Sequence, residues 1–153
     1  VRWFHAVKLP DNVPLDIAAC LKITYGTTIH ALKDLANLQS DQTLLVLGAS
    51  GGIGTAAIEI GKALGARVIA CASTDEKLEF CQTVGADYTI NYNSADFRDQ
   101  IKSITNNRGV DVVFEPFEIA VAFDTDTLAE IALCDSAHHL ANVPDHALHG
   151  AHG

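Results

Sequence analysis

The chain has 153 residues and a formal net charge of −9, with 48% hydrophobic and 19% charged residues. Its length suits one domain around a single core, and its composition excludes a disordered or fibrous chain. The negative charge and the absence of a Lys/Arg cluster argue against nucleic acid as a partner. No apolar run approaches the roughly 18 residues of a membrane span, and no signal peptide is recognisable, so we expect a cytoplasmic protein without a membrane partner.

The first forty residues form a turn-rich lead-in followed by helices. Residues 1–7 read as a strand, and Pro10 and Pro14 interrupt the chain before a short helix that follows Pro14. A second, amphipathic helix is predicted over 27–38, where apolar residues recur at helical spacing. Because the sequence starts inside a predicted strand and contains no methionine, we expect it to be a piece of a longer protein.

Strands and helices then alternate as far as Pro116. The continuous apolar run 43–47 predicts a strand that is buried on both faces. Similar patterns predict strands over 67–71, 88–92 and 110–114 and helices over 53–64, 75–84 and 97–104. This alternation predicts an α/β fold with a Rossmann-like, doubly wound parallel sheet, incomplete at its C-terminal end because the pattern stops after Pro116.

A glycine-rich turn follows the first buried strand and reads Gly48-Ala49-Ser50-Gly51-Gly52-Ile53-Gly54. Ala49, Gly51 and Gly54 take the three places of the G-x-G-x-x-G dinucleotide fingerprint, with alanine a departure in the first place. A side chain at Gly51 would hold the backbone away from a pyrophosphate, whereas Gly54 lets the helix pack closely on the strand. A glycine triplet is also compatible with an ordinary tight turn, but its place between a strand, a helix and a second strand favours nucleotide binding.

The choice of cofactor is expected at the end of the second strand, about 20 residues after the glycines. An acidic residue there would select NAD, but the segment reads Ala72-Ser73-Thr74-Asp75-Glu76-Lys77. The hydroxyls of Ser73 and Thr74 and the ammonium of Lys77 are able to hold a 2′-phosphate, which favours NADP(H). Two alternatives stay open: Asp75 or Glu76 selects NAD, or Ser73 is a helix N-cap with Glu76 completing a capping box.

Four segments stand in an order and spacing typical of one family: Thr24-Tyr25-Gly26-Thr27, the turn 48–54, Lys62-Ala63-Leu64-Gly65-Ala66-Arg67-Val68-Ile69 and Gly109-Val110-Asp111-Val112-Val113. Together they resemble the zinc-independent quinone oxidoreductases of the medium-chain dehydrogenase/reductase superfamily. The likeness runs from about Leu9 to Pro116. It implies an NADPH-dependent oxidoreductase that transfers hydride to a quinone or another activated alkene or carbonyl, with a small-molecule substrate and a homodimer left open.

The resemblance also implies roles for single residues. The pyrophosphate would be lined by Ser50, Gly51, Gly52 and Ile53, the 2′-phosphate by Ser73, Lys77 and Tyr92, and the nicotinamide side by Thr27. Alternatives are a strand-end aromatic for Tyr92 and a helix N-cap for Thr27. The family's separate catalytic domain is not recognisable in this sequence and no general acid is visible, so catalytic residues stay unknown and the isolated chain is expected to be inactive.

Other functions stay open beside this one. A non-catalytic nucleotide-binding or structural fragment is the main alternative, since a fold does not fix a function. A larger reductase that acts on acyl thioesters is a third hypothesis, because its substrate residues would lie elsewhere.

The match to the family is lost after Pro116. A helix is predicted over 124–134, and the remaining tail holds five histidines: His138, His139, His146, His149 and His152. Imidazoles bind metal ions, but this spacing matches no structural zinc pattern, so we predict no metal site. We expect a dinucleotide-binding domain over 1–116 and an atypical tail over 117–153, partly helical or disordered, which arose by truncation or an altered reading frame.

Overall fold

The computed structural model describes residues 8–115. Its elements follow the order α1 (Leu15–Ile29), η2 (His30–Leu35), β1 (Thr43–Val46), α2 (Gly52–Ala63), β2 (Arg67–Ala72), α3 (Asp75–Val84), β3 (Tyr88–Asn91), α4 (Phe97–Ile104) and β4 (Val112–Phe114). The strands are all parallel in the order β3-β2-β1-β4, which confirms the predicted α/β, Rossmann-like fold. The strand expected over 1–7, the helix over 124–134 and the histidine tail lie outside the described residues, and the division at residue 116 stays a prediction.

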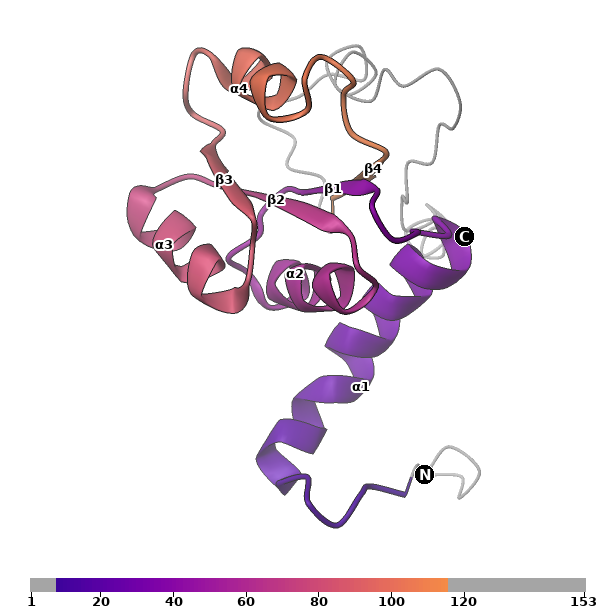
Figure 1. The fold of residues 1–153 in the computed structure, drawn as a ribbon. Coiled ribbons are helices and arrows are strands. Elements are labelled where there is room, and N and C mark those ends of the chain that lie inside the picture. The colour runs from indigo at the N-terminus through magenta and orange to yellow at the C-terminus, as the bar shows by residue number, and fades with distance from the viewer. Residues whose placement is uncertain (1–7, 116–153) are drawn as a thin grey trace, which may run out of the picture.

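The sheet is the middle of three layers (Figure 1). α2 and α3 cover one face, and α4 covers the other. In β1 and the residue after it, Leu44 and Val46 belong to the core on the α2 side, whereas Leu45 and Leu47 belong to the core that contains Phe97 of α4. Successive side chains of a strand point to opposite faces, so these two sets of residues bury both faces of β1. This confirms the doubly buried strand that the continuous apolar run predicted.

The elements after residue 43 lie where the sequence predicts them, within one or two residues. α3 and α4 have the predicted bounds. α3 stops because Gly85 takes the left-handed conformation, with φ 118°, and ends the helix as its C-cap. β4 begins at Val112, two residues later than predicted, because the preceding turn extends through Gly109, whose φ is 72°.

The two helices predicted before residue 38 were wrong as separate elements. α1 is one helix from Leu15 to Ile29 and continues directly into η2, a π-helical segment. No proline lies between Pro14 and Leu38, so none breaks the helix between the two predicted segments. The amino-terminal half of α1 projects beyond the layers (Figure 1), and its residue Leu15 is 78% exposed.

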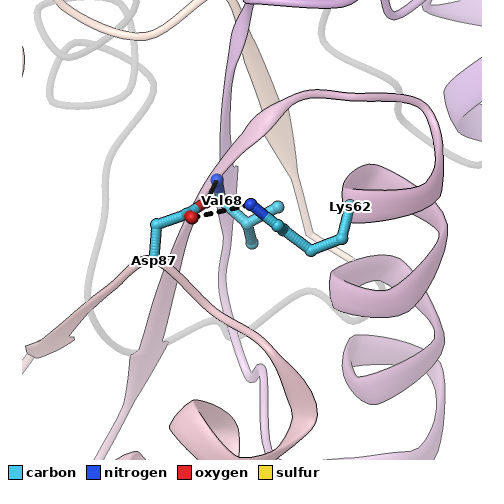
Figure 2. Close-up of polar contacts among 3 residues, drawn as sticks. All are labelled: Lys62, Val68 and Asp87. Carbon is cyan, nitrogen blue, oxygen red and sulfur yellow. Dashed lines mark hydrogen bonds and ion pairs between the residues drawn. The ribbon is translucent and has the colours of Figure 1, made fainter.

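Two aspartates make matching contacts at the amino-terminal ends of the parallel strands. Asp87, just before β3, accepts a hydrogen bond from the Val68 N–H at 2.7 Å, and its own N–H donates to the Val68 carbonyl at 3.0 Å. Lys62 of α2 adds an ion pair to the same carboxylate at 2.6 Å (Figure 2). Asp111, just before β4, makes the same reciprocal pair with Thr43 of β1, at 2.7 and 3.0 Å. These contacts hold neighbouring strands in register at their amino-terminal ends. The candidate nucleotide site lies at the carboxyl ends of the same strands.

Candidate nucleotide-binding site

The glycine turn leaves the carboxyl end of β1 and leads directly into α2. Gly48 makes the sharp change of direction, with φ 61°, a conformation that glycine adopts without strain. The following Ala49 is fully buried, and its N–H donates to the Cys71 carbonyl of β2 at 3.0 Å. The turn glycine is therefore one place earlier than the fingerprint requires, which explains why alanine is accepted at position 49.

Gly54 and Gly51 serve different purposes in this turn. A Cβ on Gly54 would lie 2.6 Å from the Gly48 carbonyl oxygen and 2.7 Å from Ala49 Cα, so the fold itself requires glycine. A Cβ on Gly51 would meet only the Gly48 oxygen at 3.5 Å, and Gly51 is extended, with φ −79° and ψ 165°. Packing therefore does not demand glycine at position 51, and two physical reasons remain: its place as the N-cap of α2 and space for a ligand.

The start of α2 offers backbone donors. The N–H groups of Gly52, Ile53 and Gly54 make no hydrogen bond within residues 8–115, and the first turn of α2 contains no acidic residue. Free N–H groups and the helix dipole together favour an anion at this position. Ser50 and Ile53 are half-buried in the turn, and Gly51 and Gly52 are exposed, so none of the four residues predicted to line the pyrophosphate is fully buried.

A second cluster lies where β2 ends. The Lys77 ammonium donates to the Ser73 hydroxyl at 3.1 Å, and the Lys77 N–H donates to the Thr74 hydroxyl at 3.4 Å. Thr74 is therefore the N-cap of α3, and the alternative that Ser73 caps this helix was wrong. Ser73 lies one residue too early, still at the end of the strand, which leaves its hydroxyl beside the lysine.

The loop after β3 joins this cluster. Tyr92, half-buried against the core on the α4 side, donates its N–H to the Ala72 carbonyl at 3.2 Å. The next residue, Asn93, donates its side-chain amide to the Ser73 carbonyl at 3.1 Å. The structure thus brings together three predicted residues, Ser73, Thr74 and Lys77, and adds Asn93, which the sequence reasoning missed. Tyr92 lies in the adjoining loop, but its side chain packs against the core on the α4 side. The available signal for Asn93 was its place just after β3, on the edge where β1 and β2 also end.

Thr27 does not join these clusters. It is exposed near the end of α1, and no side-chain hydrogen bond joins it to the glycine turn within the described residues. The alternative that Thr27 is an N-cap was wrong, because the helix continues through it from Leu15 to Ile29. Its predicted place on the nicotinamide side stays a prediction.

The thiol nearest the glycine turn and the metal-binding side chains can be assessed in the described part of the chain. Burial, together with the nearby Cys81, raises the pKa of the Cys71 thiol far above its usual value, so this thiol beside the turn is neutral. No group of three or more His, Cys, Asp or Glu side chains in residues 8–115 is placed to hold a metal ion. Across that range, no helix is long and apolar enough to cross a membrane.

Comparison with known proteins shows the family to which this chain belongs. A family model described as zinc-binding dehydrogenase matches residues 52–129. The chain belongs to the quinone oxidoreductase-like branch of the medium-chain dehydrogenase/reductase superfamily. A quinone oxidoreductase-like protein 2 homolog of Nematostella vectensis is 40% identical over 71% of this chain and 30% of its own length. A highly reducing polyketide synthase of Arthrinium phaeospermum is 38% identical over 74% of this chain and 5% of its own length.

Solved structures share the fold of this medium-chain dehydrogenase/reductase chain. The CurK enoyl reductase superposes with a TM-score of 0.68 at 30% identity, over 82% of this chain and 36% of that one. CurA of Vibrio vulnificus, solved in complex with NADPH, superposes with a TM-score of 0.57 at 35% identity, over 61% of this chain and 28% of that one. The chain therefore has a nucleotide-binding dehydrogenase fold and spans less than a third of the curated relatives described above.

Proposed function

We propose that this chain is the NADP(H)-binding domain of an oxidoreductase. The observation that carries the proposal is the Lys77 ammonium on the Ser73 hydroxyl, 3.1 Å apart, at the end of β2, where an NAD-specific domain would have an acidic side chain. Relatives named as quinone oxidoreductase-like and a fold neighbour solved with NADPH support it.

The turn and helix α2 suit the pyrophosphate. Within residues 8–115 the N–H groups of Gly52, Ile53 and Gly54 have no hydrogen-bond partner, and no carboxylate of the first turn competes for them. The helix dipole adds about 0.3–1 kcal/mol for an anion, and up to about 2 kcal/mol when the site is partly buried. These backbone groups would bind and orient the pyrophosphate, and this role requires no change in their protonation.

The Ser73–Lys77 pair suits the 2′-phosphate. An ammonium has three donors, and Ser73 occupies one of those of Lys77, so two remain for phosphate oxygens. The Ser73 hydroxyl accepts from the lysine and keeps its own proton to donate to the phosphate. Charge-assisted bonds of this kind contribute about 1.5–3 kcal/mol each.

Selection of NAD by Asp75 or Glu76 is the competing proposal for the cofactor. Both residues are exposed and lie in the first turn of α3, after the Thr74 cap, where negative charge stabilises the helix. That role explains their presence without a ribose. Their charge would weaken 2′-phosphate binding, so measured preference between the two cofactors decides between the proposals.

We further propose hydride transfer to a quinone or another activated alkene or carbonyl, with zinc-independent chemistry in the cytoplasm. NADPH supplies the hydride, and the residues of this chain hold the nucleotide. An alternative acceptor is the alkene of an acyl thioester, which the likeness to a polyketide synthase and to an enoyl reductase favours.

The test combines cofactor binding with turnover on the full chain. NADPH is titrated by its fluorescence, and its oxidation is followed with a quinone and with an enoyl thioester. Binding with turnover of either acceptor supports an oxidoreductase and identifies the acceptor class. Binding without turnover of either one is expected both of an isolated binding domain and of a non-catalytic nucleotide-binding fragment, and failure to bind NADPH contradicts the proposal.

A further inference from the structure

Asn93 connects two loops of the nucleotide site. Its side-chain Nδ2 donates to the Ser73 carbonyl at 3.1 Å, across 20 positions of sequence. Ser73 lies in the turn between β2 and α3, and Asn93 lies in the loop between β3 and α4. The bond therefore ties the turn that carries the predicted phosphate donors to the next loop along the same sheet edge.

Asn93 is itself held in place by its own loop. Its N–H donates to the Asn91 side-chain oxygen at 3.0 Å, so the loop has a local turn of the type that asparagine favours. One residue earlier, the Tyr92 N–H donates to the Ala72 carbonyl at 3.2 Å. The loop after β3 is thus joined to the last residue of β2 by a backbone bond and to the turn after β2 by the side-chain bond of Asn93, and only the second bond depends on side-chain identity.

We infer that Asn93 is a positioning residue for recognition of the 2′-phosphate, an inference that rests on the proposed NADP(H) function. By holding the Ser73 carbonyl, it restricts the backbone of the turn and so the direction of the Ser73 hydroxyl. The Lys77 ammonium is bonded to that hydroxyl at 3.1 Å and is oriented with it. Donors that are ordered before the ligand arrives lose less entropy when it binds.

The amide of Asn93 is suited to this position for two reasons. A backbone carbonyl needs a donor, which an amide supplies and a carboxylate does not. A neutral group also adds no repulsion to a phosphate bound at Ser73 and Lys77.

The test measures the dissociation constants of NADPH and NADH for the full chain, its Asn93→Ala variant and an Asn12→Ala control. Asn12 is exposed in the turn before α1. We expect Asn93→Ala to weaken NADPH binding about three- to tenfold, as loss of one ordering hydrogen bond implies. NADH binding and the melting temperature are expected to stay at the wild-type value, and the control to change nothing.

A second arm asks whether Asn93 acts through the other two residues. In a Ser73→Ala/Lys77→Met background, Asn93→Ala is expected to have no further effect on NADPH, because the donors it orients are gone. Equal weakening of NADPH and NADH, unchanged NADPH affinity, or an effect that persists in this background overturns the inference. Failure of the proposed function is seen separately, in a wild-type chain that shows no preference for NADPH.

Discussion

The ammonium of Lys77 donates a hydrogen bond to the hydroxyl of Ser73 at 3.1 Å, at the end of β2. Removing the charge by Lys77→Met is expected to weaken NADPH binding about tenfold, because a charge-assisted bond to phosphate is lost, and to leave NADH binding unchanged. Cofactor fluorescence titration checks this. Lys33→Met, at an exposed lysine of η2, controls for the change in net charge. Equal losses for both cofactors would show that Lys77 does not contact the 2′-phosphate.

Gly51→Val is expected to abolish cofactor binding while the fold persists. The backbone at Gly51 is extended, and its added Cβ would meet only one atom, at 3.5 Å. The stability cost should stay near 1 kcal/mol, the scale of a changed N-cap. Binding is measured by titration, and unfolding by urea.

Gly54→Ala is the matched contrast to that variant. Its Cβ would lie 2.6 Å from a backbone oxygen, so we expect destabilisation of about 1–3 kcal/mol or more from overpacking. A Gly51→Val variant with unchanged NADPH affinity would refute the assignment of the turn to the pyrophosphate.

Asp87 predicts a pH dependence of stability. Partial burial opposes its charge, but the Lys62 hydrogen bond, the Val68 N–H and the charges of Lys62 and Arg67 outweigh it and lower the pKa of Asp87 (Figure 2). A lowered pKa gives stability that is present above the unfolded pKa of about 3.9 and lost as pH falls through the folded value. Asp87→Asn is therefore expected to cost about 1 kcal/mol at neutral pH, with the difference from wild type vanishing in acid.

Urea unfolding between neutral and acid pH measures this difference. Asp11→Asn, at an exposed turn residue, is the control and should track wild type throughout. A difference for Asp87→Asn that stays constant into acid would contradict the ion-pair account.

Two glycines predict stability changes of opposite sign for the same substitution. Gly26 lies inside α1, with no atom within 4 Å of an added Cβ, so Gly26→Ala should stabilise by about 0.5–1 kcal/mol through helix propensity. Gly85 has φ 118°, so Gly85→Ala should destabilise by a similar or larger amount. Thermal unfolding of both variants checks this, and a shift of the same sign in both would be inconsistent with the structure.

The sequence was sufficient for the sheet because its signals are local. The apolar run of β1 and the glycine that ends α3 each specify an element without reference to the rest of the chain. The continuous helix from Leu15 was missed because the spacing of apolar residues shows which side of a helix is buried, and not where the helix ends. Only a helix-breaking pattern of proline or glycine would have indicated two separate helices.

The candidate site was predictable where its residues follow local sequence signals. Gly51, Gly54, Ser73 and Lys77 were proposed as site residues because each is placed by its distance from a strand end. Asn93 and the reciprocal bonds of Asp87 and Asp111 depend on contacts between segments far apart in sequence, at 2.7–3.1 Å, which spacing does not reveal. The N-cap was assigned one residue too early because Ser73 and Thr74 are both good capping residues and only the end of β2 distinguishes them.

We propose above all that this chain recognises the 2′-phosphate of NADP(H). The most direct test is the ratio of the dissociation constants of NADH and NADPH for the unmodified chain, measured by titration at one ionic strength. We predict that NADPH binds at least about tenfold more tightly, the ratio that one charge-assisted contact supplies. Equal affinity, or tighter binding of NADH, would contradict the account and would point to Asp75 or Glu76 on the ribose.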